Sequence, residues 1–364
     1  MMKIRKLFYV LAFFIVVSIY HSGEVFAADE KEHLGYTVSM VQPKTQIDPK
    51  RSYFYIQTRP NEPQNIEVRI KSTKKEAVKI KIFSQNAITG NNGTIDYTEE
   101  LADKDASLTS PITEMVKVET PEVTVENFEE KTVKITIMPP KESYKGVKMG
   151  ALVFALDQGQ EAKNGVATEF SYRIGLITSE SGDEFTNGET LNLTEAKASI
   201  KRGKKMVLAT LQNPEPKTVE GLTVSAELTK KNSEKVIKKK NVKNYAMAPN
   251  SHVDFEIDWG TNTLPSGKYM ITLAIHSDYQ EWYLQKEFTI TNQQAKTINK
   301  ESAFKIITPK WGQLTAIALL FFTLINSCWL MARRRKWEME WEKLRRAKKR
   351  ERLNKKNHKA KSQR

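Results

Sequence analysis

A charge-free apolar run near the C-terminal end constrains this chain more than any other feature. The run extends from Trp311 to Met331. About 20 such residues are what a helix needs to cross a hydrocarbon core about 30 Å thick. Trp311 and Trp329 lie near its two ends, where amphipathic aromatic side chains prefer the membrane interface. The sequence therefore predicts one C-terminal transmembrane helix, residues 311–331.

The basic residues around this run are distributed unequally. A single lysine precedes the run, and four basic residues follow it almost at once: Arg333, Arg334, Arg335 and Lys336. Basic segments next to a membrane span stay on the cytoplasmic side. These four residues therefore set the predicted topology, with residues 28–310 outside the cell and residues 332–364 as a cytoplasmic basic tail.

The N-terminal end has the pattern of an export signal. Basic residues come first, an apolar stretch follows from Leu7 to Ile19, and the segment ends in Val25-Phe26-Ala27. This order of basic, apolar and small residues predicts a cleaved signal peptide, residues 1–27. The apolar stretch is too short to cross a membrane comfortably, which disfavours an uncleaved anchor.

The positive net charge of +15 is concentrated outside the folded body. Residues 332–364 contain 16 lysines and arginines against four acidic residues, whereas residues 28–331 contain 39 against 38. A nucleic-acid reader carries its basic face on the folded domain, so no nucleic-acid partner is expected. The sole cysteine, Cys328, lies within the apolar run and excludes an intramolecular disulfide, as is typical of bacterial surface proteins without disulfide staples.

Between Gly35 and Asn292 apolar and polar residues alternate with a period of two, and breaks rich in Gly, Pro and Asn separate the runs. In the stretch 252–259 the alternation is clean, with Val253, Phe255 and Ile257 on one face and acidic residues on the other. Short strands at this spacing are typical of β-sandwiches. The sequence predicts a mainly β fold with two tandem immunoglobulin-like β-sandwich domains.

A polar segment without alternation separates the two predicted domains. This segment, residues 181–190, is the predicted linker. It follows an N-terminal β-sandwich of residues 28–180 and precedes a C-terminal β-sandwich of residues 191–292. Residues 293–310 are predicted to form a stalk, with a short helix around residues 295–305.

The residues needed for catalysis are not grouped along the chain. The histidines of the ectodomain, His33, His252 and His276, have no metal-ligand spacing. There is no nucleophile elbow and no phosphate-binding loop. We therefore predict that the protein is not an enzyme, and we predict no cofactor, no catalytic residue and no metal ligand.

Several clusters leave alternatives open, and none identifies a binding residue. The acidic row of residues 254, 256 and 258 fits either a Ca²⁺ site or, as is commoner, a solvated strand face. The basic stretch 230–243 fits anionic wall polymers or, preferably, a charged hairpin tip. Aromatic pairs that share a strand face are more often core than site: Tyr53 with Tyr55, and Tyr279 with Tyr283.

The tail continues the helical pattern beyond the predicted span. Trp337, Trp341 and Leu344 fall on one face at spacings of four and three residues, among many basic side chains. Such a stripe either lies on an anionic inner leaflet or belongs to a solvated segment that serves only topology.

Eight stretches resemble the WxL-interacting proteins of Gram-positive bacteria, in the order of that family: YTVSMVQPKTQIDPKRSYFYIQ (36–57), NAITGNNGTIDY (86–97), YKGVKMGALVF (144–154), LQNPEP (211–216), MAPNSHVDFEIDW (247–259), LPSGKYMITLAI (264–275), WYLQKEFTIT (282–291) and AKTIN (295–299). No single stretch is a catalytic fingerprint. The resemblance covers almost the whole chain and rests on the order of these stretches.

The resemblance implies a peptidoglycan-binding domain followed by a host-binding domain, displayed at the plasma membrane of a Gram-positive bacterium. The implied partners are WxL-domain surface proteins, peptidoglycan and, in addition, a host extracellular-matrix protein. Two other hypotheses stay open from the residues themselves. One is a stand-alone adhesin for host matrix, and the other is an accessory subunit of a cell-envelope complex whose tail signals inward.

Overall fold

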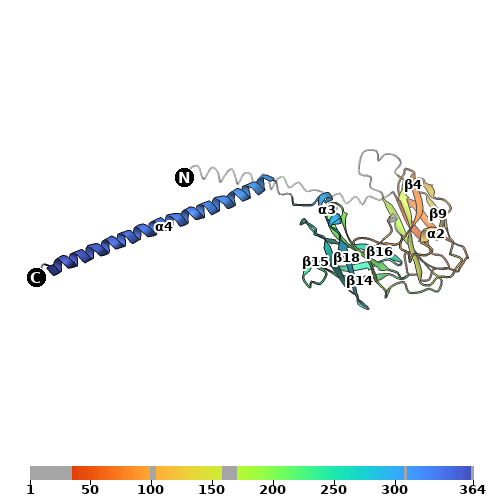
Figure 1. Cartoon of the computed structure of the whole chain (residues 1–364). Coiled ribbons are helices and arrows are strands. Elements are labelled where there is room, and N and C mark those ends of the chain that lie inside the picture. Colours follow the sequence, from red (N-terminus) through yellow and green to blue (C-terminus); the bar gives the residue numbers. More distant parts are fainter. Residues whose placement is uncertain (1–34, 99–103, 158–169, 307–309, 362–364) are drawn as a thin grey trace, which may run out of the picture.

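The computed structural model describes residues 35–98, 104–157, 170–306 and 310–361. The predicted signal peptide lies outside the described residues. The described chain is mainly β, as the sequence predicted, and forms two immunoglobulin-like sandwiches followed by a long helix (Figure 1).

The first sandwich packs a four-stranded sheet against a five-stranded sheet. The first sheet has the order β1 (Tyr36–Val41), β3 (Gln64–Ser72), β9 (Glu130–Ile137) and β7 (Val116–Val118). The second has the order β2 (Phe54–Gln57), β11 (Ser171–Ser179), β10 (Val147–Leu156), β4 (Val78–Asn86) and β8 (Glu122–Val125). All pairs are antiparallel except β2 with β11, which are parallel.

Alternation explains how these strands form one core. In β3 the side chains of Ile66, Val68 and Ile70 are buried, while the intervening polar residues face solvent. Because successive strand residues point to opposite faces, the apolar set meets the opposite sheet. β10 is the exception, since it is buried on both faces. Its Leu152 and Phe154 belong to the main core, whereas Val147 and Met149 belong to a separate apolar cluster.

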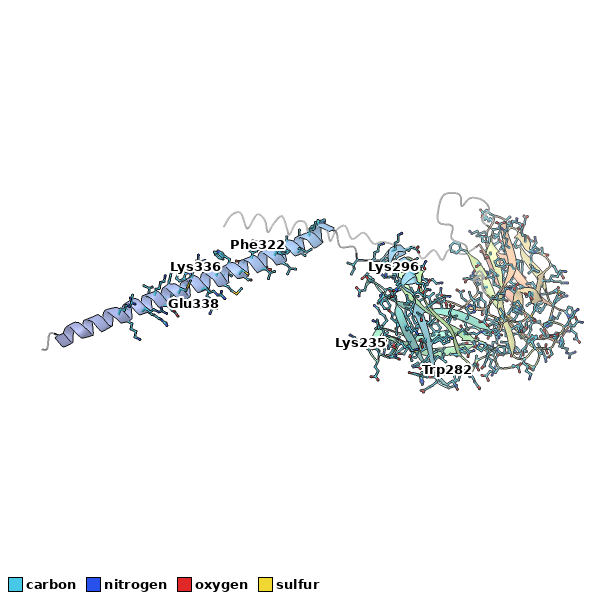
Figure 2. All side chains as sticks on the ribbon, viewed as in Figure 1. Lys235, Trp282, Lys296, Phe322, Lys336 and Glu338 are labelled. Carbon is cyan, nitrogen blue, oxygen red and sulfur yellow. The ribbon has the colours of Figure 1, made fainter. Side chains whose placement is uncertain are left out.

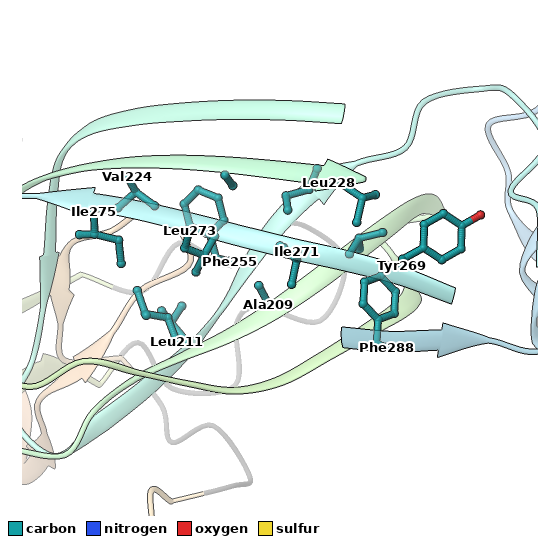
Figure 3. Packing of buried hydrophobic residues seen from close by; sticks show 14 of the residues in the cluster. Ala209, Leu211, Val224, Leu228, Phe255, Tyr269, Ile271, Leu273, Ile275 and Phe288 are labelled. Carbon is teal, nitrogen blue, oxygen red and sulfur yellow. The ribbon is translucent and has the colours of Figure 1, made fainter. Parts of the chain in front are cut away.

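The second sandwich is built in the same way from a three-stranded and a four-stranded sheet. The smaller sheet has the order β12 (Asn192–Lys201), β13 (Lys204–Asn213) and β16 (Ser251–Asp258). The larger one has the order β15 (Val236–Met247), β14 (Val219–Lys230), β17 (Gly267–His276) and β18 (Glu281–Ile290). Figure 3 shows the core between them, where Leu211 and Phe255 of the smaller sheet face Ile271 and Leu273 of the larger one.

Helix α3 (Asn292–Glu301) packs against this sandwich. Thr291 and Gln294 form a capping box at its start, which fixes where the helix begins. Ala295 and Ile298 are buried in the core of the second sandwich, and Asn299 exchanges two 2.8 Å hydrogen bonds with the Leu264 backbone. The first part of the segment predicted as a stalk is therefore attached to the domain surface.

Helix α4 (Lys310–Lys361) contains both the apolar run and the basic tail in 52 consecutive helical residues (Figure 1). At about 1.5 Å per residue it is about 78 Å long. The part from Leu314 onward is long and apolar enough to cross a membrane. The helical continuation predicted for the tail is confirmed as far as Lys361.

A small hairpin docks the first sandwich onto the second. It consists of β5 (Ile88–Thr89) and β6 (Ile95–Asp96). The Thr89 hydroxyl lies 2.6 Å from the Ser251 hydroxyl and accepts a 3.0 Å hydrogen bond from the Ala248 amide. At the hairpin tip, the carbonyl of Gly93 accepts a 2.7 Å hydrogen bond from the Ala246 amide.

Glycine is required at this tip for two reasons. Gly93 has a φ of +77°, a conformation that side-chain-bearing residues rarely adopt, and it lies flat against the Tyr245 ring. A Cβ atom built at Gly93 would lie 2.1 Å from Cδ2 of Tyr245. A second such contact occurs at Gly146, whose φ is +74° and which packs against Pro216. At both places, the backbone of the first sandwich therefore lies in direct contact with a side chain of the second.

The segment between the sandwiches is also anchored. The Asp183 carboxylate accepts a 3.1 Å hydrogen bond from the Gly146 amide, and the Asp183 carbonyl accepts one from the Tyr55 hydroxyl. Phe185 packs edge-on against the Tyr55 ring at 5.2 Å. The last strand of the first sandwich ends at Ser179, and the first strand of the second begins at Asn192. The segment predicted as a linker, residues 181–190, is therefore held against the first sandwich by these contacts.

Gly93→Ala should loosen this junction more than the same change at an open glycine. Gly221 is the matched control, because its φ is +68° but nothing lies within 4 Å of its Cβ position. Both changes introduce about 1–2 kcal/mol of backbone strain, and Gly93→Ala adds about 1–3 kcal/mol because the Tyr245 ring must move. Urea unfolding of an ectodomain of residues 28–306 measures the difference. Equal losses for the two variants would contradict the close packing at Gly93.

Candidate binding surfaces

A buried carboxylic acid, Asp105, lies at the junction between the two sandwiches. Its side chain is 4% exposed, and Nδ1 of His252 lies 2.9 Å from its carboxylate. The amide of Gln212 donates to both carboxylate oxygens, and the backbone and hydroxyl of Ser107 also donate. Burial disfavours the charged carboxylate, but the hydrogen bonds from Ser107, Gln212 and His252 outweigh it and lower the pKa of Asp105.

This cluster connects the two sandwiches. Asp105 belongs to the first sandwich, whereas Gln212 and His252 lie on β13 and β16 of the second. All donors converge on one carboxylate that is closed off from solvent. His252 was predicted to lack metal partners, and its ring is here held by an interdomain hydrogen bond. His276, the other described histidine of the two sandwiches, pairs with Glu281 at 3.0 Å on the exposed end of β17.

Basic side chains pair with each member of the acidic row on β16. Asp254 contacts Lys201 at 3.5 Å, Asp258 contacts Lys204 at 3.8 Å, and Glu256 pairs with Arg202. Glu256 is buried, which differs from the solvated face that the sequence predicted, because Arg202 covers it. In the part of the chain that the structure describes, no three acidic, histidine or cysteine side chains are grouped as metal ligands.

The basic stretch 230–243 forms the end of β14, the turn and most of β15. Several of its lysines are engaged within the domain. Lys239 pairs with Glu227 and Lys231 with Glu287, each at 2.7 Å. The ammonium of Lys240 lies 4.5 Å from the centre of the Phe255 ring. Lys235 lies at the periphery of the second sandwich (Figure 2). The internal contacts favour a charged hairpin over a dedicated polyanion site.

The larger sheet of the second sandwich has a polar outer face with one exposed aromatic ring. We call it the outer sheet face, and it consists of two cross-strand rows: Asn241, Ser225, Ala274 and Tyr283, and Lys239, Glu227, Thr272 and Gln285. Tyr283 is 70% exposed. Its neighbour across the strand is Ala274, so the ring rises above small side chains.

Hydrogen bonds order this face. The Gln285 amide donates to the Thr272 hydroxyl at 3.2 Å and to the Tyr283 hydroxyl at 3.0 Å, and Ser225 donates to Asn241 at 2.9 Å. The charged pair in the second row, Lys239 with Glu227, is internally neutralised. A rigid tyrosine among hydroxyl and amide groups is the composition that protein contact sites favour.

The aromatic pairs noted in the sequence do not form shared sites. Tyr55 is buried, and its hydroxyl is used at the junction. Tyr279 donates to the carbonyl of Gly188 at 2.9 Å and packs edge-on against Trp282, so it fastens the interdomain segment. Tyr283 faces the opposite way because it lies one residue from the buried Trp282. It is therefore an exposed residue, where the sequence favoured a core position for the pair.

An open groove of about 580 Å³ lies between β12 and α3. Its lining is mostly polar: Ala198, Ser199, Ile200, Thr291, Gln293, Gln294, Thr297, Ile298 and Glu301. The groove follows a strand at the edge of its sheet. The groove offers a shaped surface, hydrogen-bonding side chains and the carboxylate of Glu301.

The predicted topology-setting residues follow the apolar part of α4. They are exposed, the guanidinium of Arg333 lies 5.3 Å from the centre of the Trp329 ring, and Arg334 pairs with Glu338 at 3.1 Å. The structure fixes their place on the helix, and their effect on orientation stays a prediction.

Four of the eight stretches that carry the family resemblance meet at the junction. The stretch 86–97 contains the docking hairpin, and 247–259 contains Ala248 and Ser251, which bond with Thr89 of the hairpin. The stretch 144–154 contains Gly146, which packs on Pro216 of the stretch 211–216. Sequence reasoning missed this, because each stretch looks like an isolated turn or strand until the fold brings the pairs together.

Comparisons with known proteins agree with the two-domain architecture. A family model described as the peptidoglycan binding domain of WxL Interacting Protein matches residues 36–155, and one described as its host binding domain matches residues 161–300. The structure places β11, which falls within the second match, in the sheet of the first sandwich. No curated protein matches the sequence.

Solved structures similar to this chain include bacterial chaperones. The YadV chaperone is 12% identical, with 71% of this chain and 100% of that chain covered and a TM-score of 0.27. The E. coli chaperone DraB is 12% identical, with 70% and 98% covered and a TM-score of 0.26. The Pseudomonas aeruginosa CupB2 chaperone is 13% identical, with 62% and 93% covered and a TM-score of 0.24.

These structural similarities are too remote to carry a functional argument. The family matches are different in kind, because together they extend over most of residues 36–300 and identify both sandwiches as binding domains. On this evidence the chain belongs to the WxL-interacting protein family.

Proposed function

We propose that this protein is a membrane-anchored scaffold at the surface of a Gram-positive bacterium, which binds WxL-domain proteins and peptidoglycan and presents a face to host factors. The observation that carries the proposal is the combination of two binding domains, fastened to each other, with one long apolar helix in the same chain. Neither domain has a grouping of described residues suited to catalysis, which supports binding as the role.

The fastened junction supports a scaffold rather than two independent binders. Two sites on one rigid body hold their ligands at a fixed separation, which raises the effective concentration of one ligand near the other. Rigid presentation also lowers the entropy lost on binding. A WxL-domain protein bound to one sandwich would thus be held at a defined position relative to the wall polymer on the other.

The apolar helix and its basic tail support anchoring. A chain that emerges from the second sandwich and crosses the membrane keeps both binding domains outside and close to the bilayer. The alternative of a stand-alone adhesin needs host matrix but no WxL partner or wall polymer. The alternative of an accessory subunit needs the tail to act beyond topology, and replacing residues 337–364 by a short basic stub tests that requirement.

Co-sedimentation of residues 28–306 with purified peptidoglycan, with and without a WxL-domain protein of the same bacterium, tests the proposal directly. We expect the ectodomain to pellet with peptidoglycan and to retain the WxL-domain protein in a stable complex. Failure of both interactions would reject the scaffold and make host-matrix binding the leading hypothesis.

Tyr283→Ala should weaken the contact of the second sandwich with its protein ligand by about ten-fold or more, since exposed tyrosines at contact sites contribute about 1–2 kcal/mol or more. The melting temperature should stay unchanged because the ring is exposed. Phe128→Ala is the control, since Phe128 is 55% exposed on the first sandwich. Equal binding by wild type and Tyr283→Ala, measured by calorimetry with the WxL-domain protein or the host factor, would exclude the outer sheet face.

Replacing Arg333, Arg334, Arg335 and Lys336 by glutamine should leave part of the population with the tail outside the cell, because the basic segment next to the span is lost. Protease treatment of intact protoplasts, read with an antibody against the tail, measures this. The control replaces four basic residues farther along the tail: Lys355, Lys356, Lys359 and Lys361. A tail equally protected in both variants would show that the leader alone sets orientation.

A further inference from the structure

One end of the second sandwich is strongly basic. Four segments form this end, which we call the basic end: residues 201–205, 230–235, 258–268 and 291–306. Together they contain eleven lysines and arginines against three acidic residues. Residues 28–331 as a whole contain 39 against 38, so the rest of the folded body has a net negative charge. The positive charge of the ectodomain is therefore concentrated at one end.

Strand register brings the four segments together, away from the first sandwich. Met206 pairs with Asp258, so the β12–β13 turn lies beside the end of β16. Lys230 pairs with Tyr269, so the β14–β15 turn lies beside the start of β17. The hairpin of the first sandwich contacts Ser251, where β16 begins. The basic end and the junction thus lie at opposite ends of the second sandwich.

The chain leaves the ectodomain through the basic end, and its path there is fixed. The carbonyl of Gly203 accepts hydrogen bonds from the Ala303 amide at 2.9 Å and from the Ser302 hydroxyl at 3.1 Å. The ammonium of the buried Lys205 donates to the carbonyl of Phe304 at 3.3 Å. These bonds hold the exit point of the chain beside the β12–β13 turn.

Covalent geometry limits the distance between this exit point and the membrane. Lys310, where α4 begins, follows Ile306 by four residue steps, and an extended chain covers about 14 Å over four steps. Trp311 marks the expected membrane interface. Figure 1 shows α3, which belongs to the basic end, between the second sandwich and the start of α4. The basic end is therefore held close to the lipid headgroups, whatever angle α4 adopts.

The exposed side chains of the basic end suit an anionic bilayer surface. Lys235, Lys296 and Lys300 are exposed and form no ion pair with another described residue. At the chain exit, the side chains of Phe304 and Ile306 are 50% and 67% exposed. Basic side chains accompanied by a few exposed apolar ones are typical of surfaces that bind anionic membranes.

The pKa of Lys205 is sensitive to the positive charge around it. Burial lowers this pKa, and the charge of Lys305 lowers it further, against a smaller opposing effect of Asp258. Asp258 also pairs with Lys204 at 3.8 Å. The few acidic residues of the basic end therefore leave most of its positive charge available to an anionic partner.

We propose that the basic end docks on anionic phospholipid headgroups of the outer leaflet, with the first sandwich directed away from the bilayer. A lipid surface fits this end better than a soluble polymer does, because the short connection to α4 holds it at the membrane and the exposed apolar side chains lie at the chain exit. The proposal rests on the membrane anchoring proposed above. It gives the domain matched to peptidoglycan binding a fixed direction, toward the cell wall.

Headgroup quenching in lipid nanodiscs tests the docking with the full chain. In a Cys328→Ser background, Asn262→Cys places a fluorophore on the basic end. Asn127→Cys places the same fluorophore in the β8–β9 turn of the first sandwich, and both positions are exposed. Lipids with a spin label on the headgroup quench a fluorophore only at close range. Discs of phosphatidylcholine alone are compared with discs that also contain phosphatidylglycerol.

We expect strong quenching at position 262 in the anionic discs and weaker quenching there in the neutral discs. Position 127 should be quenched little in either. Added salt should reduce the difference between the two kinds of disc at position 262, because it screens the attraction between exposed charges.

Charge variants separate docking from mere proximity. Replacing Lys235, Lys296 and Lys300 by glutamine should lower the ratio of docked to undocked ectodomain by about five-fold for each lysine. The control removes the same charge from exposed positions of the first sandwich and should leave the quenching unchanged: Lys71, Lys75 and Lys134.

The outcomes separate the docking from the anchoring. Co-elution of the chain with the discs first establishes insertion, and a chain that elutes apart from them would reject both proposals. Insertion with equal quenching in neutral and anionic discs, or with quenching that the basic-end variant does not change, would overturn the docking and leave the anchored scaffold intact. Displacement by soluble polyglycerol phosphate at the same phosphate concentration would overturn the bilayer as the occupant.

Discussion

The close approach of the β5–β6 hairpin to the second sandwich is the contact on which the rest of the ectodomain depends. Gly93 lies against the Tyr245 ring, and Thr89 bonds with Ser251 and Ala248. Each of these contacts has one partner in each sandwich. Without the junction, the chain would consist of two separate domains on a tether, with no fixed distance between the surfaces they present.

Polar and apolar contacts contribute differently to this junction. The apolar cluster that includes Val147, Met149 and Ala248 supplies burial without direction. The Asp105 carboxylate supplies direction, because its donors come from both sandwiches and fit only one relative orientation. A buried carboxylate is tolerated there because several hydrogen bonds compensate for its desolvation. Together these contacts hold the two sandwiches against each other.

The surfaces left exposed differ in character from this junction. The outer sheet face is hydrogen-bonded, nearly neutral and carries one free aromatic ring, Tyr283. Helix α4 is exposed along its described length, apolar in its first part and basic in its tail. Both surfaces are free for contacts to other molecules. A surface scaffold needs one surface that binds its ligand and a second that anchors it.

The sequence by itself determined the elements whose signal is local. The period-two alternation, the charge-free run and the basic residues after it each depend on neighbours in the chain, so the mainly β class, the two sandwiches and the long C-terminal helix were predictable. What only the tertiary structure decided is which distant residues meet. Three features depend on how whole sheets pack, and no local pattern encodes them. They are the pairing of Asp105 with His252, the contact of Gly93 with Tyr245 and the exposure of Tyr283.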